Sequence, residues 1–193
     1  MKHNFLIILS CTIGGQNIQS EIPDTDNTDK IEDSSENNKF ELISNAFENN
    51  GKIPEKFTCD GQNISPSLSW SGTPPSTKSF VLIVDDPDAV QVVGKTFIHW
   101  NLVNLPSNID KLPENMSIDK YPSAKILKNS SGKEKYMGPC PPAGQNHRYF
   151  FTLFAMDDIH KYQVSLTAEE FKQKMKEHIL GEAVLIGTYQ RKK

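Results

Sequence analysis

Hydrophobic residues along the chain gather in three short runs that few polar residues interrupt. The runs occupy residues 79–84, 97–105 and 148–156, and β-branched and aromatic side chains are frequent in them. Runs of this length are typical of strands buried on both faces, because a strand with one wet face alternates apolar and polar residues. We therefore predict three core strands.

Three shorter segments, at residues 40–43, 68–70 and 183–189, are predicted as additional strands. Pro- and Gly-containing stretches between the segments mark turns, and the polar residues 106–129 predict a long loop. Many short strands joined by such turns are typical of a mostly-β sandwich with peripheral helices.

One clear helix is predicted near the C-terminus. Thr167 and Glu170 have the spacing of a capping box, in which the threonine oxygen accepts from the third helical amide and the glutamate reaches back. Phe171 and Met175 mark the apolar face of this helix, which we expect to end at Gly181.

The chain has 193 residues and a net charge of −3, which gives no general footprint for binding nucleic acid. The charge is uneven, because residues 12–38 hold seven acidic residues and one lysine. We expect residues 12–38 to be a disordered acidic tether and residues 39–193 to form one nearly neutral domain.

Residues 1–11 combine one lysine, a short apolar core and the pair Ser10-Cys11. This pattern resembles a bacterial secretion signal that ends in a lipobox, so we expect export and lipidation of Cys11. No apolar run approaches the roughly 18 residues of a membrane span, which leaves a lipid anchor as the expected membrane contact. The alternative is a start without a targeting role and a cytoplasmic location.

A rigid loop precedes the last core strand. The sequence GPCPPAG at residues 138–144 holds three prolines, which excludes a helix or a central strand. Alternation along the following strand places His147 and Tyr149 on one face and Arg148 on the other. A polar pocket at the mouth of the loop is one interpretation, and a structural histidine at a strand end is the other.

A second polar stretch, Asp85-Asp86-Pro87-Asp88, follows the first core strand directly. Carboxylates are not buried without partners, so these residues cap the strand at the surface, form a simple turn or line a pocket. His99 lies inside the second core strand and is either structural or a pocket residue.

Four motifs together, DPDA, HWNLVNLP, GPCPPAG and HRYFFTLFAMD, resemble the phosphatidylethanolamine-binding protein family. The closest likeness is to its bacterial and archaeal branch, the Raf-kinase-inhibitor-like proteins, and it runs from about residue 40 to residue 191. The resemblance implies an antiparallel β-sandwich of two sheets, with a small pocket at one end. It also implies that the pocket holds phosphate, other small anions or phospholipid head groups without a metal.

The resemblance assigns a set of ligand-binding residues by motif: Asp86, Asp88, His99, Cys140, Pro141, His147 and Tyr149. Arg148, on the opposite face, is expected to orient an acid such as Asp88. Val90 stands where the family usually has proline, which leaves the pocket wall near Ala89 undetermined.

Two imidazoles and a carboxylate suit a zwitterionic or protonated phosphate ester better than a bare dianion. Each imidazole can donate to an anion oxygen, and Asp86 can fix a histidine tautomer or bind an ammonium group. We therefore expect tighter binding near pH 6 than near pH 8. Cys59 and Cys140 either pair or stay as two free thiols, and both alternatives are open.

The sequence favours a binding protein without catalytic residues, metal or cofactor, because HExxH, CxxC and GxSxG motifs are absent. The alternatives are a hydrolase that uses a metal or an Asp86–His99 acid–base pair, and a structural lipoprotein with a vestigial pocket. His178 is interpreted as a charge at a helix end, with a ligand role as the alternative. The resemblance adds a protein target, such as a kinase or protease, and a homodimer as expected partners.

Overall fold

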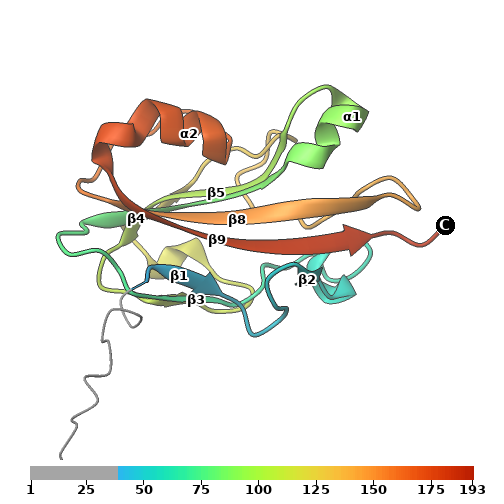
Figure 1. Cartoon of the computed structure of the whole chain (residues 1–193), viewed down its shortest axis with the longest axis horizontal. Coiled ribbons are helices and arrows are strands. Elements are labelled where there is room, and N and C mark those ends of the chain that lie inside the picture. The colour runs from blue at the N-terminus through green and yellow to red at the C-terminus, as the bar shows by residue number, and fades with distance from the viewer. Residues whose placement is uncertain (1–38) are drawn as a thin grey trace, which may run out of the picture. The chain divides into compact units, whose positions relative to one another are not determined.

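The computed structural model describes residues 39–193, which form two packed β-sheets with helices on one side (Figure 1). The strands are β1 (Glu41–Ile43), β2 (Gly51–Lys52), β3 (Leu68–Ser71), β4 (Ser79–Asp86), β5 (Phe97–Pro106), β6 (Lys111–Leu112), β7 (Lys125–Ile126), β8 (Asn146–Met156) and β9 (Ile179–Gln190). The α-helices are α1 (Val90–Val93) and α2 (Ala168–Met175), and four 3-10 turns are Glu55–Phe57, Pro87–Ala89, Ile118–Lys120 and Lys176–His178. The predicted mostly-β sandwich is confirmed.

The larger sheet has the strand order β2-β9-β8-β4-β5-β7, and the smaller sheet has the order β1-β3-β6. Pairing is antiparallel except between β2 and β9, which run parallel and so depart from the predicted antiparallel pattern. β2 adds only two residues at the edge of the sheet.

The three predicted core strands are confirmed as β4, β5 and β8, and β4 lies between the other two. All eight residues of β4 are buried because both faces of the sheet are covered, one by the smaller sheet and the other by α2 (Figure 1). Phe80 and Leu82 belong to the core between the sheets, whereas Val81 and Ile83 pack with Phe171 of α2. This double burial explains the unbroken apolar pattern.

The C-terminal helix confirms the capping box but ends earlier than predicted. Thr167 accepts from the Glu170 amide, and the Glu170 side chain accepts from the Thr167 amide. The chain leaves α2 through the turn Lys176–His178 and enters β9 at Ile179, so Gly181 lies within a strand. Gly181 pairs with Ala155 of β8, so its backbone groups are satisfied within the sheet and not by a longer helix.

Pro106 ends β5, and the remaining residues 107–129 form the predicted long loop, which includes only the short elements β6, β7 and one 3-10 turn. Among residues 39–193, no helix has the length and apolar character to cross a membrane. The predicted signal segment with Cys11 and the predicted tether at residues 12–38 lie outside the described residues. Export, lipidation and disorder of the tether therefore stay predictions.

Candidate functional site

A cavity of about 120 Å³ opens at one end of the larger sheet. Because β4 is antiparallel to β5 and β8, its last residue lies beside the first residues of both neighbours. Three titratable side chains meet there, Asp86 from β4, His99 from β5 and His147 from β8. The remaining lining residues are Ala89, Val92, Val93, Phe97, Met137, Cys140, Pro141 and Pro142.

Asp86 and His147 form a buried pair at the closed end of this cavity. The Asp86 Oδ2 atom lies 2.8 Å from His147 Nδ1, and Asp86 Oδ1 accepts from the Ala89 amide at 3.0 Å. The two side chains are only 4% and 5% exposed. His147 Nδ1 therefore carries its proton toward the carboxylate, and His147 Nε2 makes a long contact of 3.3 Å with Gln145 Oε1, which a ligand would have to replace.

His99 has the opposite hydrogen-bonding character. Its Nδ1 atom donates to the Met137 carbonyl oxygen at 2.7 Å. Burial lowers the pKa of His99 below 6.5, so the imidazole is neutral at physiological pH. In this tautomer Nε2 has a free lone pair, and His99 offers the cavity an acceptor rather than a donor.

Tyr149, which the motif assigned to the ligand-binding set, is not among the residues that line the cavity. Tyr149 is fully buried behind His99, whose ring meets it edge-on at a centroid distance of 5.2 Å. Burial and the nearby charge of Asp86 raise the pKa of Tyr149. Its hydroxyl lies near the Asp86 carboxylate and the Cys140 backbone, although it makes no hydrogen bond of ordinary geometry with any described residue. The predicted alternation is confirmed, and the Tyr149 ring packs behind His99 with its hydroxyl near the Asp86 carboxylate.

Asp88 also lies outside the lining of the cavity. Its carboxylate accepts from Arg148 Nε at 3.0 Å, from Arg148 Nη2 at 2.7 Å and from the Arg148 amide at 2.9 Å. These bonds lower the pKa of Asp88. The 3-10 turn Pro87–Ala89 rotates the chain so that Asp86 faces inward and Asp88 faces outward. The expected role of Arg148 agrees with this geometry.

The third acid, Asp85, belongs to a different contact that sequence reasoning missed. It accepts from the amide of Ala168 at 2.8 Å and so caps the first turn of α2. Burial raises the pKa of Asp85 from 3.8 to about 6. The alternative of an Asp86–His99 acid–base pair has no hydrogen bond behind it, because the Asp86 carboxylate bonds His147 and His99 bonds Met137.

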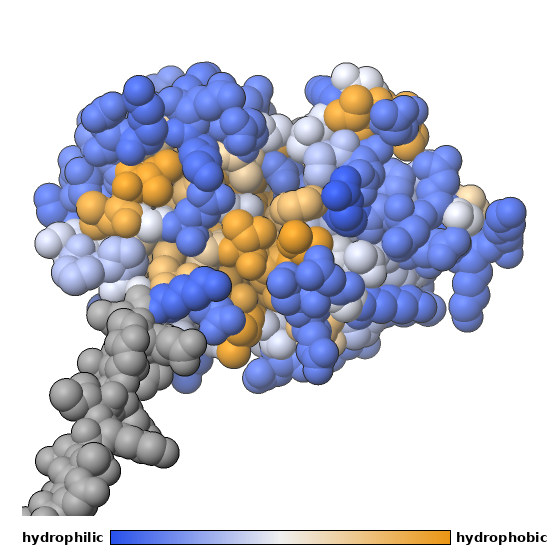
Figure 2. All heavy atoms as spheres, in the orientation of Figure 1, coloured by the Kyte–Doolittle hydropathy of each residue, from blue (hydrophilic) through white to orange (hydrophobic). Residues whose placement is uncertain are grey.

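Val90 begins the short helix α1, and no cis peptide bond occurs within residues 39–193. The helix brings Val92 and Val93 to the mouth of the cavity, where they are 47% and 49% exposed. Figure 2 shows the resulting apolar surface over α1. The apolar sequence VQVV was the only sign of this rim along the chain. It is too short to show the periodicity of a strand or a helix, so the rim could not be predicted from it.

A disulfide joins Cys59 to Cys140, so neither residue offers a free thiol. Two hydrogen bonds reinforce this link between the cavity loop and residues 59–63. The Cys59 amide donates to the Pro139 carbonyl at 3.1 Å, and the Gly138 amide donates to Asn63 Oδ1 at 2.7 Å. The loop is therefore held over the cavity by a covalent bond as well as by proline geometry.

Comparison with known proteins gives consistent matches over the described domain. A family model for phosphatidylethanolamine-binding protein matches residues 43–190. A UPF0098 protein of Methanothermobacter thermautotrophicus is 44% identical over 152 residues, covering 78% of this chain and 98% of that protein. A UPF0098 protein of Aquifex aeolicus is 41% identical over 157 residues, covering 79% and 89%.

Two solved structures have a similar fold. A putative phosphatidylethanolamine-binding protein homologue from Chlamydia trachomatis has a TM-score of 0.70 and 38% identity, covering 80% of this chain and 99% of its own. YbcL of Escherichia coli, described as a new member of the mammalian PEBP family, has a TM-score of 0.70 and 29% identity, covering 79% and 99%. In both, the match covers most of this chain.

Proposed function

Since the chain belongs to the phosphatidylethanolamine-binding protein family, we propose that its cavity binds small phosphate-type ligands, such as a phosphoethanolamine head group, without chemical turnover. The observation that carries the proposal is the meeting of Asp86, His99 and His147 in one cavity of about 120 Å³. This volume suits a phosphate or a head group and excludes a whole phospholipid.

The hydrogen-bonding pattern favours a ligand that has both an acceptor and a donor. His147 Nε2 donates to a phosphate oxygen when the ring is protonated, and the Asp86 carboxylate stabilises that charge through Nδ1. His99 Nε2 accepts, so it pairs with an ammonium N–H or with the hydroxyl of a protonated phosphate. No lysine or arginine lines the cavity, which disfavours a bare dianion.

The apolar rim suits the part of a ligand that extends out of the cavity. Val92, Val93 and Phe97 line the opening, and the two valines are about half exposed. A glycerol backbone or the start of an acyl chain that covers such a surface removes apolar area from water, which lowers the free energy of the complex. The polar end would then select the head group, and the rim would favour a lipid over free phosphate.

Calorimetry with inorganic phosphate and O-phosphoethanolamine tests the proposal. We expect both to bind about tenfold more tightly at about pH 6 than at about pH 8, because a phosphate monoester loses its last proton near pH 6 and only the protonated form offers a hydroxyl to the His99 Nε2 acceptor. Equal affinities at the two pH values would contradict the proposed role of protonation. Vesicles with and without phosphatidylethanolamine then separate a lipid ligand from a free one.

Matched histidine variants locate the binding site. His147→Ala is expected to weaken O-phosphoethanolamine binding at least about tenfold, because a charge-assisted bond is lost. His178→Ala, whose side chain lies outside the cavity, is expected to bind as the unaltered protein does. Thermal melts of both variants check that the fold is intact, and equal binding by both would remove the cavity as the site.

A hydrolase is the second candidate, because the buried Asp86–His147 pair has the geometry of a general base held by a carboxylate. No serine, threonine or free cysteine lines the cavity, so water would be the nucleophile. Phosphomonoesterase and phosphodiesterase assays with the unaltered protein and with His147→Ala decide between the two. Turnover that His147→Ala abolishes would replace the binding proposal.

A further inference from the structure

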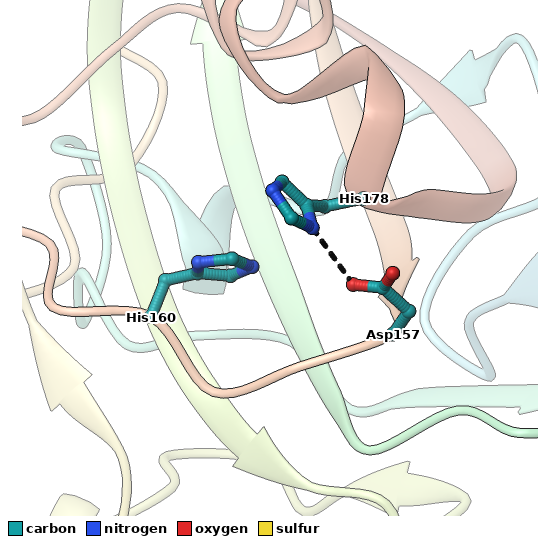
Figure 3. Close-up of side chains that lie close together, drawn as sticks. All are labelled: Asp157, His160 and His178. Carbon is teal, nitrogen blue, oxygen red and sulfur yellow. Dashed lines mark hydrogen bonds and ion pairs between the residues drawn. The ribbon is translucent and has the colours of Figure 1, made fainter.

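Asp157, His160 and His178 form a cluster that the phosphate-site proposal does not use (Figure 3). Asp157 directly follows β8, His160 lies in the connection to α2, and His178 ends the 3-10 turn before β9. One ligand atom from each of the three side chains lies within 4.8 Å of the others. Ten residues of extended chain separate His147 from Asp157, so the cluster lies roughly 30 Å from the cavity.

The backbone already holds two of these side chains in place. His178 Nδ1 lies 3.0 Å from Asp157 Oδ1, and the Asp157 amide donates to the His178 carbonyl at 3.0 Å. The third side chain is positioned by Asn104, whose Nδ2 atom donates to the His160 carbonyl at 2.9 Å. The His160 and His178 rings lie 4.4 Å apart at 63°, and Figure 3 shows His160 directed toward the other two residues.

His160 provides an independent sign that this cluster binds a ligand. Its Nε2 atom is buried and has no hydrogen-bond partner among the described residues. Buried polar atoms in folded proteins nearly always have a partner, because an unpaired one costs the lost hydration. An imidazole nitrogen directed at a second imidazole and a carboxylate is satisfied by a metal ion.

We propose that Asp157, His160 and His178 bind a divalent transition metal ion, with zinc as the best fit. Two imidazoles and one carboxylate are ligands of zinc and similar ions, whereas magnesium and calcium prefer oxygen ligands. Zinc bonds of this type need ligand atoms about 3.3 Å apart, which small side-chain rotations achieve here. The side chains of His178 and Asp157 are 43% and 39% exposed, so water has access to a fourth position.

The metal would join three segments that no disulfide links. It would tie the end of β8, the connection 157–167 and the start of β9, all next to the α2 side of the sheet. Asp158 adds a second carboxylate near both histidines, and the positive charge of Lys78 also lies near Asp158. The sequence hid this site because its three ligands come from separate segments, and His178 alone is typical of a helix end.

Zinc and magnesium titrations of the full-length protein, produced without a polyhistidine tag, test the proposal. We expect the unaltered protein to bind one more zinc ion than His178→Ala, or the same ion at least about tenfold more tightly. Zinc should raise the melting temperature of the unaltered protein by at least about 3 °C, and magnesium should not. Cobalt absorption then reports whether imidazole and carboxylate ligands surround the ion.

His178→Ala carries the test because its side chain is half exposed, whereas loss of His160 risks local unfolding beside Tyr162. His147→Ala is the matched control and is expected to keep the zinc ion. Any zinc that His3 or Cys11 holds is common to all variants and cancels in the difference. Equal zinc binding by the unaltered protein and His178→Ala, or an equal response to magnesium, would overturn the proposal.

Discussion

Asp85, Asp86 and Asp88 lie within four residues of one another, yet each carboxylate has a different partner. Asp85 bonds the first turn of α2, Asp86 bonds His147 in the cavity, and Asp88 bonds Arg148 at the surface. Solvent exposure and the charge of the partner then set the direction in which the pKa of a carboxyl group shifts. Burial raises the pKa of Asp85, and the Arg148 guanidinium lowers the pKa of Asp88.

Asp85→Asn is expected to change how stability depends on pH. Because the pKa of Asp85 rises from 3.8 unfolded to about 6 folded, its contribution is fully present below about pH 4 and is lost as pH rises through 6. The loss amounts to at most about 3 kcal/mol of unfolding free energy. Asparagine retains an acceptor for the Ala168 amide, so Asp85→Asn should gain stability relative to the unaltered protein as pH rises. Urea unfolding at several pH values measures this difference.

Asp88→Asn is the matched control for that experiment. The pKa of Asp88 is lowered, so its stabilising contribution is present above the unfolded pKa and is lost as pH falls. The two substitutions should therefore change the pH profile in opposite directions. Parallel profiles for the two variants would show that burial does not control the ionisation of Asp85.

At the scale of elements, α2 depends on contacts at its first turn. Thr167 and Glu170 satisfy each other's backbone amides, and Asp85 accepts from Ala168. The helix then packs Phe171 against Phe154 of the sheet, with ring centroids 5.0 Å apart. A helix of eight residues has little stability in isolation, so these caps and this packing hold it in place.

Thr167→Ala is expected to lower the unfolding free energy by about 1 kcal/mol, because the Glu170 amide loses its acceptor. Thr167→Ser keeps the oxygen and should lie within about 0.5 kcal/mol of the unaltered protein. Denaturant unfolding of the two variants side by side measures the difference. Equal losses for alanine and serine would attribute the effect to packing of the threonine methyl group.

At the scale of the whole molecule, the cavity depends on segments that are distant in sequence. The disulfide between Cys59 and Cys140 closes a separation of 81 residues and holds the cavity loop. Antiparallel pairing within the larger sheet brings the end of β4 to the first halves of β5 and β8, and the loop after β5 returns the chain to the smaller sheet through β6. The cavity therefore forms only when the strand pairing of the larger sheet and the disulfide are both in place.

Cys140→Ser is expected to lower the unfolding free energy by about 2 to 4 kcal/mol, because the unfolded chain regains the freedom that the disulfide removes. Binding of O-phosphoethanolamine should weaken as well, since the cavity loop loses its covalent tie. The double variant Cys59→Ser with Cys140→Ser should be no less stable than Cys140→Ser, because the bond is already absent. Mass measurement without reductant that finds two free thiols would contradict the disulfide itself.

The local sequence pattern was sufficient to predict an element where burial of a continuous apolar run, or a hydrogen bond between near neighbours, decides the structure. The apolar runs of β4, β5 and β8 and the capping box of α2 were predicted correctly, because each depends on neighbouring residues. Gly181 was misread because pairing with Ala155, far away in sequence, outweighs a local stop signal. Tyr149 and Asp88 were assigned to the cavity because a motif indicates proximity but not the direction of a side chain.

The amino-acid sequence by itself determined the family, the mostly-β fold and the segments that carry Asp86, His99 and His147. Burial patterns and motif spacing are local properties, so they can be read along the chain. Only the tertiary structure decided which partner each polar group has: His147 rather than His99 for Asp86, Arg148 for Asp88, and His178 for Asp157. Those pairings depend on the register and packing of distant strands, which only the folded chain establishes.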